Sequence, residues 1–160
     1  DSEKKITLPP QQRKVGYLFQ QYALFPNMSV ERNILCGIRS GDKAEKRRVL
    51  AEKIRMFRLE GLEKKHPAQL SGGQQQRCAI ARAIAVKPSL ILADEPTGNL
   101  DKKTGREILQ IFRELHQAGN TIVLITHDPK VAQSAERVIR IEDGQLYENQ
   151  EVPQDDLPVV

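Results

Sequence analysis

The chain alternates between short apolar runs and longer polar segments in which apolar side chains recur at helical spacing. Three runs, at residues 14–19, 90–93 and 121–125, have the length and the aliphatic or aromatic composition of strands. A fourth pattern, over residues 137–147 with an Asp-Gly dipeptide inside it, is typical of a β-hairpin. The sequence therefore predicts three separated strands and a closing hairpin.

Helices are predicted between the strands. One apolar stripe of helical period follows residue 42 and a second follows residue 104; their members are Val49, Leu50, Ile54, Phe57 and Leu59, and Ile108, Ile111, Phe112 and Leu115. A third helix is predicted from Gly72, where small side chains permit close packing, and Pro88 ends it. Because a strand, a helix and a strand follow one another over residues 90–125, an α/β fold with a parallel sheet is expected.

Cap residues mark where several helices begin. Ser29 is a preferred N-cap for a short helix. Two pairs, Asp42 with Glu45 and Thr104 with Glu107, have the spacing of a capping box. Helices are therefore expected to start at these positions.

Composition limits the class of protein. The 160 residues are 39% hydrophobic and 29% charged, which is typical of one globular domain. The chain has no run of about 18 apolar residues, and its first residues lack the order of a signal peptide, so a cytosolic protein is expected. Cys36 and Cys78 lack the spacing of a metal site and are expected to be buried free thiols.

The net charge of +4 arises from a basic excess before residue 141 and an acidic stretch after it. The basic residues are mixed with acids on predicted helices, and only 4% of the residues are aromatic. Solvated helix faces therefore explain the charge, and no nucleic-acid partner is expected. Acids and prolines dominate the last residues, which predicts a disordered tail over residues 149–160.

Residues 70–77, Leu-Ser-Gly-Gly-Gln-Gln-Gln-Arg, form the most informative stretch. Ser71 is a preferred N-cap, and Gly72 and Gly73 let backbone N–H groups approach an anion without a Cβ in the way. The stretch predicts a helix whose N-terminus faces a phosphate.

A second stretch adds carboxylates. The apolar run at residues 90–93 ends in Asp94 and Glu95. Acids at the C-terminal edge of a parallel strand are well placed to hold a metal ion and a water molecule. The sequence predicts a metal and water site there.

Together these two stretches resemble the signature and Walker B motifs of the ATP-binding-cassette (ABC) ATPases. The resemblance covers essentially residues 1–148. It implies a partial P-loop NTPase (RecA-like) core with a parallel sheet in residues 1–22 and 87–148, and an α-helical signature subdomain in residues 23–86.

The resemblance implies roles for residues at matching positions. Glu95 would accept the proton of the attacking water, and Asp94 would hold magnesium through water. Gln20, which follows the first predicted strand, matches the Q-loop glutamine that reaches both the metal and the water. His127, which follows the third, matches the switch histidine that steadies the γ-phosphate. The implied catalytic residues are Glu95, His127 and Gln20, and the implied metal residues are Asp94 and Gln20.

In this family two cassettes close head to tail around two ATP molecules. The signature residues Ser71, Gly72, Gly73 and Gln74 would contact the γ-phosphate bound by the other subunit, and Asp101 matches the D-loop that crosses to it. The implied cofactors are ATP and Mg²⁺. The implied partners are a second ABC ATPase subunit and a transmembrane permease subunit, which implies a peripheral location on the cytoplasmic face of the cell membrane.

The segment after Gln20 is a candidate docking surface. Residues 22–30 contain Tyr22, Leu24, Phe25 and Met28. In the family this position receives a short helix of the membrane subunit. For Leu24 or Phe25 alone, packing in the protein interior is an equally good explanation.

The phosphate-binding motif G-x-x-x-x-G-K-[ST] does not occur in these 160 residues, and neither does the early aromatic residue that stacks on adenine in the family. Both normally precede the Q-loop. An amino-terminally truncated cassette is therefore expected, with negligible ATP hydrolysis by the isolated chain, because the β- and γ-phosphates would lose their main charge partner.

The resemblance is divided between two kinds of transporter. Residues 8–38 resemble importer ATPases of the molybdate and sulfate type. Residues 90–145 resemble the ATPases of macrolide-export and lipoprotein-release systems. The transported substrate therefore stays open.

The sequence can be compared with three alternatives to a transporter ATPase. A DNA-repair ATPase would carry a long coiled coil between Gln20 and Ser71, and no sustained heptads occur there. A translation-factor ATPase would need two tandem cassettes. The third alternative is an inactive fragment that acts only as an interaction module.

Overall fold

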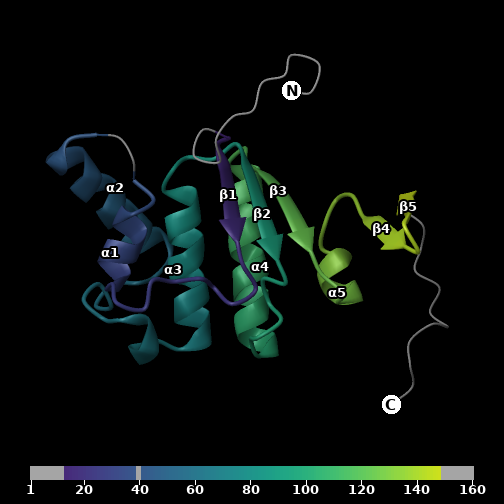
Figure 1. Ribbon diagram of the computed structural model, residues 1–160, viewed down its shortest axis with the longest axis horizontal. Coiled ribbons are helices and arrows are strands. Elements are labelled where there is room, and N and C mark those ends of the chain that lie inside the picture. Colours follow the sequence, from purple (N-terminus) through teal and green to yellow (C-terminus); the bar gives the residue numbers. More distant parts are fainter. Residues whose placement is uncertain (1–12, 39–40, 149–160) are drawn as a thin grey trace. The chain divides into compact units, whose positions relative to one another are not determined.

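The computed structural model describes residues 13–38 and 41–148 (Figure 1). The chain divides into two compact units, Asp1–Ile125 and Thr126–Val160, and each is described by itself. The disordered tail predicted for residues 149–160 lies outside the described residues.

A three-stranded parallel sheet forms the centre of the first unit (Figure 1). Its strands are β1 (Val15–Leu18), β2 (Leu90–Asp94) and β3 (Thr121–Ile125), in the order β1-β2-β3. In the register, Leu18 lies opposite Ala93, and Asp94 lies opposite Ile125. The carboxyl ends of all three strands therefore meet at one edge, and the predicted α/β fold with a parallel sheet is confirmed.

Four α-helices and a 3₁₀ helix complete the described part of this unit. They are α1 (Val30–Leu35), α2 (Lys43–Met56), the 3₁₀ helix η2 (Pro67–Gln69), α3 (Gly72–Ile84) and α4 (Lys102–Gln117). Helix α3 packs on β1 and α4 packs on β3, and α1 packs on both α2 and α3. The predicted N-caps hold for α1 and α2, because the Ser29 side chain accepts from the Arg32 N–H and Asp42 accepts from the Glu45 N–H.

The sheet buries one face more completely than the other. Leu18, Ile91 and Ala93 are buried, whereas Tyr17 and Ile125 on the other face are 41% and 49% exposed. Strand β2 accordingly alternates between buried and half-buried positions. Alternate side chains of a strand point to opposite faces, and α3 and α4 cover only one of them.

One cluster of buried side chains runs from α1, α2 and α3 through the sheet to α4. The predicted stripe of α4 contributes to it as expected, with Ile108, Phe112 and Leu115 buried. The assignment of residues 1–22 and 87–148 to a core, and of residues 23–86 to a helical subdomain, stays a prediction.

The end of α2 differs from its predicted stripe. The helix ends at Met56, so Phe57 and Leu59 lie beyond it, yet both are fully buried. Arg58 adopts a φ of 51°, and the Leu59 N–H donates to the Ile54 carbonyl at 2.9 Å. The chain thereby folds back over the helix end and returns both side chains to the core.

The cysteines are both free, but only Cys78 is buried. Burial raises the pKa of the Cys78 thiol to about 12. Cys36 is exposed, so the prediction of two buried thiols is wrong for this residue. Cys36 lies one helical turn after exposed Arg32, on the side of α1 opposite its buried residues Asn33 and Ile34.

The second unit contains α5 (Pro129–Ala132), β4 (Ile139–Glu142) and β5 (Gln145–Glu148). The two strands pair antiparallel as the predicted hairpin, and Asp143 and Gly144 between them both have positive φ, at 48° and 79°. Such angles suit the two-residue turns that favour Asp-Gly. Among the described residues of the chain, no helix is long and apolar enough to cross a membrane.

Candidate functional site

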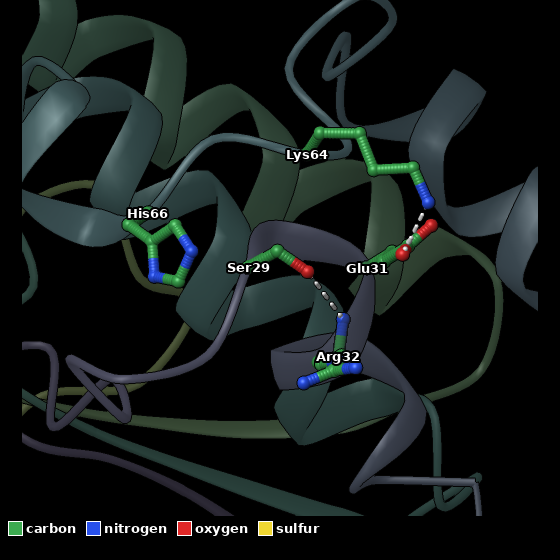
Figure 2. A pocket seen from close by; sticks show the side chains of 5 residues that line it. All are labelled: Ser29, Glu31, Arg32, Lys64 and His66. Carbon is green, nitrogen blue, oxygen red and sulfur yellow. Dashed lines mark hydrogen bonds and ion pairs between the residues drawn. The ribbon is translucent and has the colours of Figure 1, made fainter.

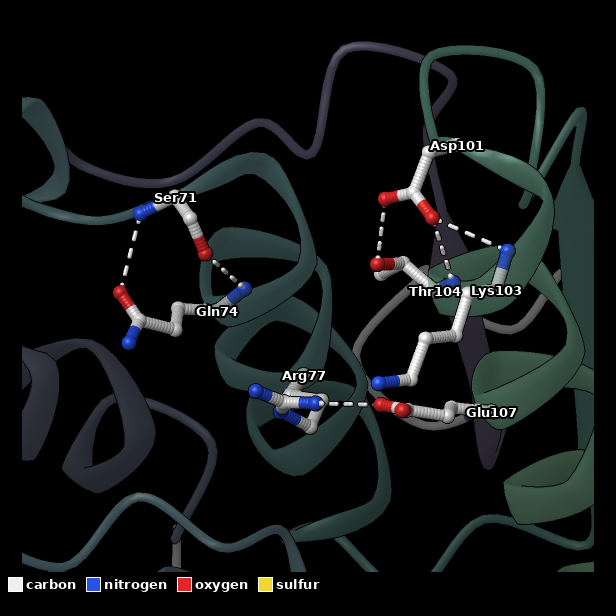
Figure 3. A network of polar contacts seen from close by, with 7 residues as sticks. All are labelled: Ser71, Gln74, Arg77, Asp101, Lys103, Thr104 and Glu107. Atoms are coloured by element: carbon white, nitrogen blue, oxygen red, sulfur yellow. Dashed lines mark hydrogen bonds and ion pairs between the residues drawn. The ribbon is translucent and has the colours of Figure 1, made fainter.

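Helix α3 begins at the predicted N-cap. The Gln74 N–H donates to Ser71 Oγ at 3.3 Å, and the Ser71 N–H donates to Gln74 Oε1 at 2.9 Å (Figure 3). The two residues form a reciprocal capping box, which the sequence analysis did not predict although Ser-x-x-Gln is its signature. The side chain of Gln74 therefore helps to fix the first turn of the helix.

The two glycines let α3 approach the loop that precedes α4. A Cβ on Gly73 would collide with Thr104 Cγ2. A Cβ on Gly72 would lie 3.3 Å from the Tyr22 hydroxyl and 3.4 Å from Leu100 Cδ2. The absence of side chains thus serves close packing as well as access to the N–H groups.

Asp101 caps the neighbouring helix, α4. Its carboxylate accepts from the Lys103 N–H at 2.9 Å, from the Thr104 N–H at 3.0 Å and from the Thr104 hydroxyl at 2.6 Å (Figure 3). The hydrogen bond from the Thr104 side chain, followed by that from its backbone, holds the pKa of Asp101 below its usual range.

The predicted capping box of Thr104 with Glu107 is wrong. The helix begins three residues earlier than that box requires, because Asp101 supplies both a charge and two acceptor oxygens to the first turn. Glu107 instead pairs with Arg77 of α3, whose Nη1 lies 3.3 Å from Glu107 Oε2 (Figure 3).

The two acids at the end of β2 lead into a bent segment. Asp94 and Glu95 are half-buried, and Glu95 has a φ of 43°, a conformation uncommon for a residue with a Cβ. The Glu95 N–H donates to the Ile125 carbonyl at 2.9 Å, and the Glu95 carbonyl accepts from the Gly98 N–H at 3.2 Å. The backbone bonds on both sides of the residue keep this bend in place.

Gln20 lies at the same edge of the sheet. It follows β1 and is exposed, and its carbonyl accepts from Asn99 Nδ2 at 3.3 Å. Asn99 belongs to the loop that joins Glu95 to Asp101, and this loop also contacts Gly72. The first unit contains the predicted site residues Gln20, Ser71, Gly72, Gly73, Gln74, Asp94, Glu95 and Asp101, and the loop that follows Asp94 and Glu95 reaches both Gln20 and the start of α3.

His127 belongs to the second unit, two residues beyond β3, and is exposed. It precedes Asp128, which caps α5 by accepting from the Lys130 N–H at 2.8 Å. Its role as the switch histidine stays a prediction.

The donor set at Asp94 suits magnesium. Within the described residues, no group of three or more His, Cys, Asp or Glu side chains is arranged to hold a metal ion. Mg²⁺ is commonly bound through one or two carboxylates, with waters and phosphate oxygens completing its shell. Asp94, with Gln20 at the same edge, fits that kind of site.

A separate polar cavity of about 310 Å³ lies at the start of α1 and is lined by Ser29, Glu31, Arg32, Lys64 and His66 (Figure 2). Ser29 Oγ accepts from the Arg32 N–H, and Lys64 pairs with Glu31 at 2.7 Å. The first contact caps α1, and the second joins α1 to the segment before η2.

Comparison with known proteins identifies the family. A family model described as ABC transporter matches residues 2–98, which is more than half of the chain. The chain therefore belongs to the ABC transporter family. Proteins of this family bind ATP, typically with Mg²⁺, through their ATP-binding cassettes, and the signature and Walker B stretches lie in such a cassette.

Relatives of two transport directions resemble the chain to a similar degree. It is 46% identical over 156 residues to a macrolide export ATP-binding/permease protein, MacB, of Syntrophobacter fumaroxidans, with 90% of this chain and 22% of the relative covered. It is 45% identical over 144 residues to a sulfate/thiosulfate import ATP-binding protein, CysA 1, of Agrobacterium fabrum, with 85% and 42% covered. The chain thus spans less than half of either relative.

A solved structure agrees with the fold. The dimeric, post-hydrolysis ATP-binding cassette MJ0796 bound to ADP and Pi matches with a TM-score of 0.73 and 38% identity. The match covers 89% of this chain and 66% of that one. The similarity therefore extends over most of this chain.

Proposed function

We propose that the chain is part of a cassette that binds and hydrolyses ATP for a membrane transporter, and that two such cassettes close head to tail around the nucleotide. The observation that carries the proposal is that the loop of residues 95–101, which follows Asp94 and contains Glu95, bonds to Gln20 through Asn99 and lies close to Gly72 at the α3 N-terminus. The permease partner places the cassette at the cytoplasmic face of the membrane.

The α3 N-terminus supplies an anion site. Helix α3 runs for 13 residues, and its first turn is capped by an exposed, neutral serine. The N–H groups of Gly72 and Gly73 have no partner within their own helix, and the helix dipole adds positive potential there. Ser71, Gly72, Gly73 and Gln74 would therefore contact the γ-phosphate held by the partner cassette.

The acids at the end of β2 would supply the chemistry of hydrolysis. When bound, ATP supplies the phosphoryl group and Mg²⁺ neutralises charge that develops on its oxygens. Glu95 would accept the proton of the attacking water, while Asp94 and Gln20 would orient the metal and the water. His127 would steady the γ-phosphate, and Asp101 would lie at the border with the partner.

The chain by itself is expected to hydrolyse ATP negligibly. Its 160 residues include no G-x-x-x-x-G-K-[ST] motif, whose lysine contacts the β- and γ-phosphates in P-loop enzymes. Magnesium-dependent phosphate release from the purified chain, at the rate of a complete cassette, would contradict this expectation.

The permease would dock on the segment after Gln20. The Phe25 ring is 47% exposed, and the Arg82 guanidinium lies 5.3 Å from its centroid. Asn33 holds the segment by donating to the Phe25, Met28 and Ser29 carbonyls and by accepting from the Phe25 N–H. A rigid, exposed aromatic residue is a good anchor for a partner helix.

Tyr22 plays a different part in the same segment. It is half-buried, burial raises its pKa, and its hydroxyl lies beside Gly72. We therefore expect Phe25→Ala to weaken co-purification with the permease without lowering the melting temperature, and Tyr22→Ala to lower the melting temperature. If Phe25→Ala instead lowered the melting temperature strongly, Phe25 would be part of the core and not of the docking surface.

The hydrolysis proposal is tested in a chimaera. A segment that carries the G-x-x-x-x-G-K-[ST] motif from an ABC ATPase is joined to the start of this chain, and phosphate release is measured with Mg²⁺ and ATP. Glu95→Gln should lower kcat by about 100-fold or more, because the general base is lost. The matched control is Glu114→Gln, on the exposed side of α4, which should retain activity. Normal turnover by the Glu95 variant would exclude Glu95 as the base.

A further inference from the structure

Gln76 is a buried polar side chain on the inward side of α3. It is 1% exposed, and its Nε2 donates to the Pro96 carbonyl at 2.7 Å. Its Oε1 has no hydrogen-bond partner within the described part of the chain. A buried acceptor without a partner is costly, so packing alone does not explain a glutamine here.

The hydrogen bond from Gln76 ends on the segment that carries Glu95. Pro96 is buried and directly follows Glu95, whose φ of 43° is uncommon for a residue with a Cβ. Such a conformation persists only where surrounding contacts determine it. The Ile125 carbonyl accepts from the Glu95 N–H, and the Gly98 N–H donates to the Glu95 carbonyl. Gln76 donates to the next carbonyl along the chain, that of Pro96.

We propose that Gln76 is a positioning residue that fixes the bent Glu95-Pro96 backbone and thereby joins the signature helix to the carboxylate that would activate water. Its importance for hydrolysis rests on the proposed function of Glu95. The positioning itself does not, because it concerns only the conformation of residues 95–98. A shift of α3, through Gln76, would reach the Glu95 segment directly.

The neighbouring glutamine provides a matched control. Gln75 Nε2 donates to the Pro67 and Leu70 carbonyls, at 3.1 and 3.2 Å, on the segment that precedes α3. Gln75 and Gln76 therefore have the same side chain, on the same helix, with the same kind of bond to backbone. They differ in which segment they hold.

The test compares Gln76→Met with Gln75→Met in the full 160-residue chain. Methionine keeps much of the side-chain volume and removes the donor. Amide hydrogen exchange is followed at Glu95 and Gly98, whose N–H groups make the bonds on either side of the bend, and at buried Ile91 and Ile108 as reporters of global opening.

Gln76→Met should speed exchange at Glu95 and Gly98 by about tenfold more than at Ile91 and Ile108, because the local segment opens while the core stays closed. Gln75→Met should show no such local difference. The proposal is overturned if both variants give the same pattern, or if Gln76→Met speeds exchange equally at all four amides. No nucleotide is used, so the outcome is independent of whether Glu95 is the catalytic base.

Discussion

The N-termini of α3 and α4 lie side by side, because Gly73 of one helix packs against Thr104 of the other, but they are capped differently. Ser71 gives α3 one neutral hydroxyl, which accepts one bond at 3.3 Å. Asp101 gives α4 a full negative charge and accepts three bonds, the shortest at 2.6 Å.

The two caps give the two helix ends different electrostatic potentials. At α4 the chain's own carboxylate satisfies the N–H groups and offsets the positive end of the helix dipole. At α3 a neutral cap and two glycines leave that potential for another anion. Under the proposed function, the two adjacent helix ends have opposite roles: the chain's own carboxylate closes one, and the other would receive a phosphate.

The largest expected effect concerns the contact between the two ends. Gly73→Ala should destabilise the fold by about 1–3 kcal/mol, because the new Cβ would collide with Thr104 Cγ2 and the Thr104 hydroxyl is held by Asp101. Chemical denaturation measures the loss. Thr104→Ser, which removes the methyl group and keeps the hydroxyl, should restore most of the stability of Gly73→Ala.

Gly72→Ala is the control for that prediction, because its Cβ would have contacts of 3.3 Å and above. Gly72→Ala should leave the free energy of unfolding nearly unchanged. If Gly72→Ala and Gly73→Ala were equally destabilising, helix-end flexibility and not the contact with Thr104 would explain both.

A smaller effect is expected from the charged cap. The pKa of Asp101 is lowered in the folded chain, so its ionised form stabilises the fold above the unfolded-state pKa of about 3.9. That contribution is lost as the pH falls through the lower, folded-state pKa. Asp101→Asn should therefore lower the melting temperature at pH 7 and flatten its dependence on pH below about 4.

Thr104→Val sharpens the same test, since the Thr104 hydroxyl is the largest cause of the lowered pKa. Melting curves of this variant should show a weaker pH dependence than those of the unchanged chain. A pH dependence identical in all three proteins would mean that Asp101 is not responsible for it.

The smallest effect is expected at the neutral cap. Ser71→Ala should cost about 1 kcal/mol of folding stability, as is usual for the loss of an N-cap. Ser71→Asp should keep that stability, because aspartate is an equally good cap and its charge suits the helix dipole. Thermal melts distinguish the two, and a Ser71→Asp chain as unstable as Ser71→Ala would show that the cap geometry requires serine.

Much of this arrangement follows from local patterns in the sequence. The strands at residues 121–125 and 90–93, the α4 stripe and the Ser71 cap were all predicted, because each depends on neighbours within a few positions. The start of α4 was mispredicted for a physical reason. The helix could plausibly start at Thr104, paired with Glu107, or at Asp101, paired with Thr104. The charge of Asp101 favours the earlier start, and Glu107 pairs with Arg77 instead.

Gln76 was missed although a signal existed. It lies on the same helical side as Gly73, Ile80 and Ile84, all buried, so a polar residue on an apolar stripe could have been noticed. Its partner, Pro96, could not have been predicted, because the bond joins residues that are 20 positions apart. Contacts of that kind depend on how α3 packs against the end of β2.

The role of the α3 N-terminus as the anion site is tested most directly in the Glu95→Gln chimaera, which should bind ATP without hydrolysing it. Its mass is measured by sedimentation with and without ATP, with serine or aspartate at position 71. With Ser71, ATP should convert monomers to dimers. With Ser71→Asp, whose charge repels the partner's γ-phosphate, the protein should remain monomeric at an unchanged melting temperature. ATP-driven dimers of equal affinity in both proteins would contradict the assignment of this helix end to phosphate.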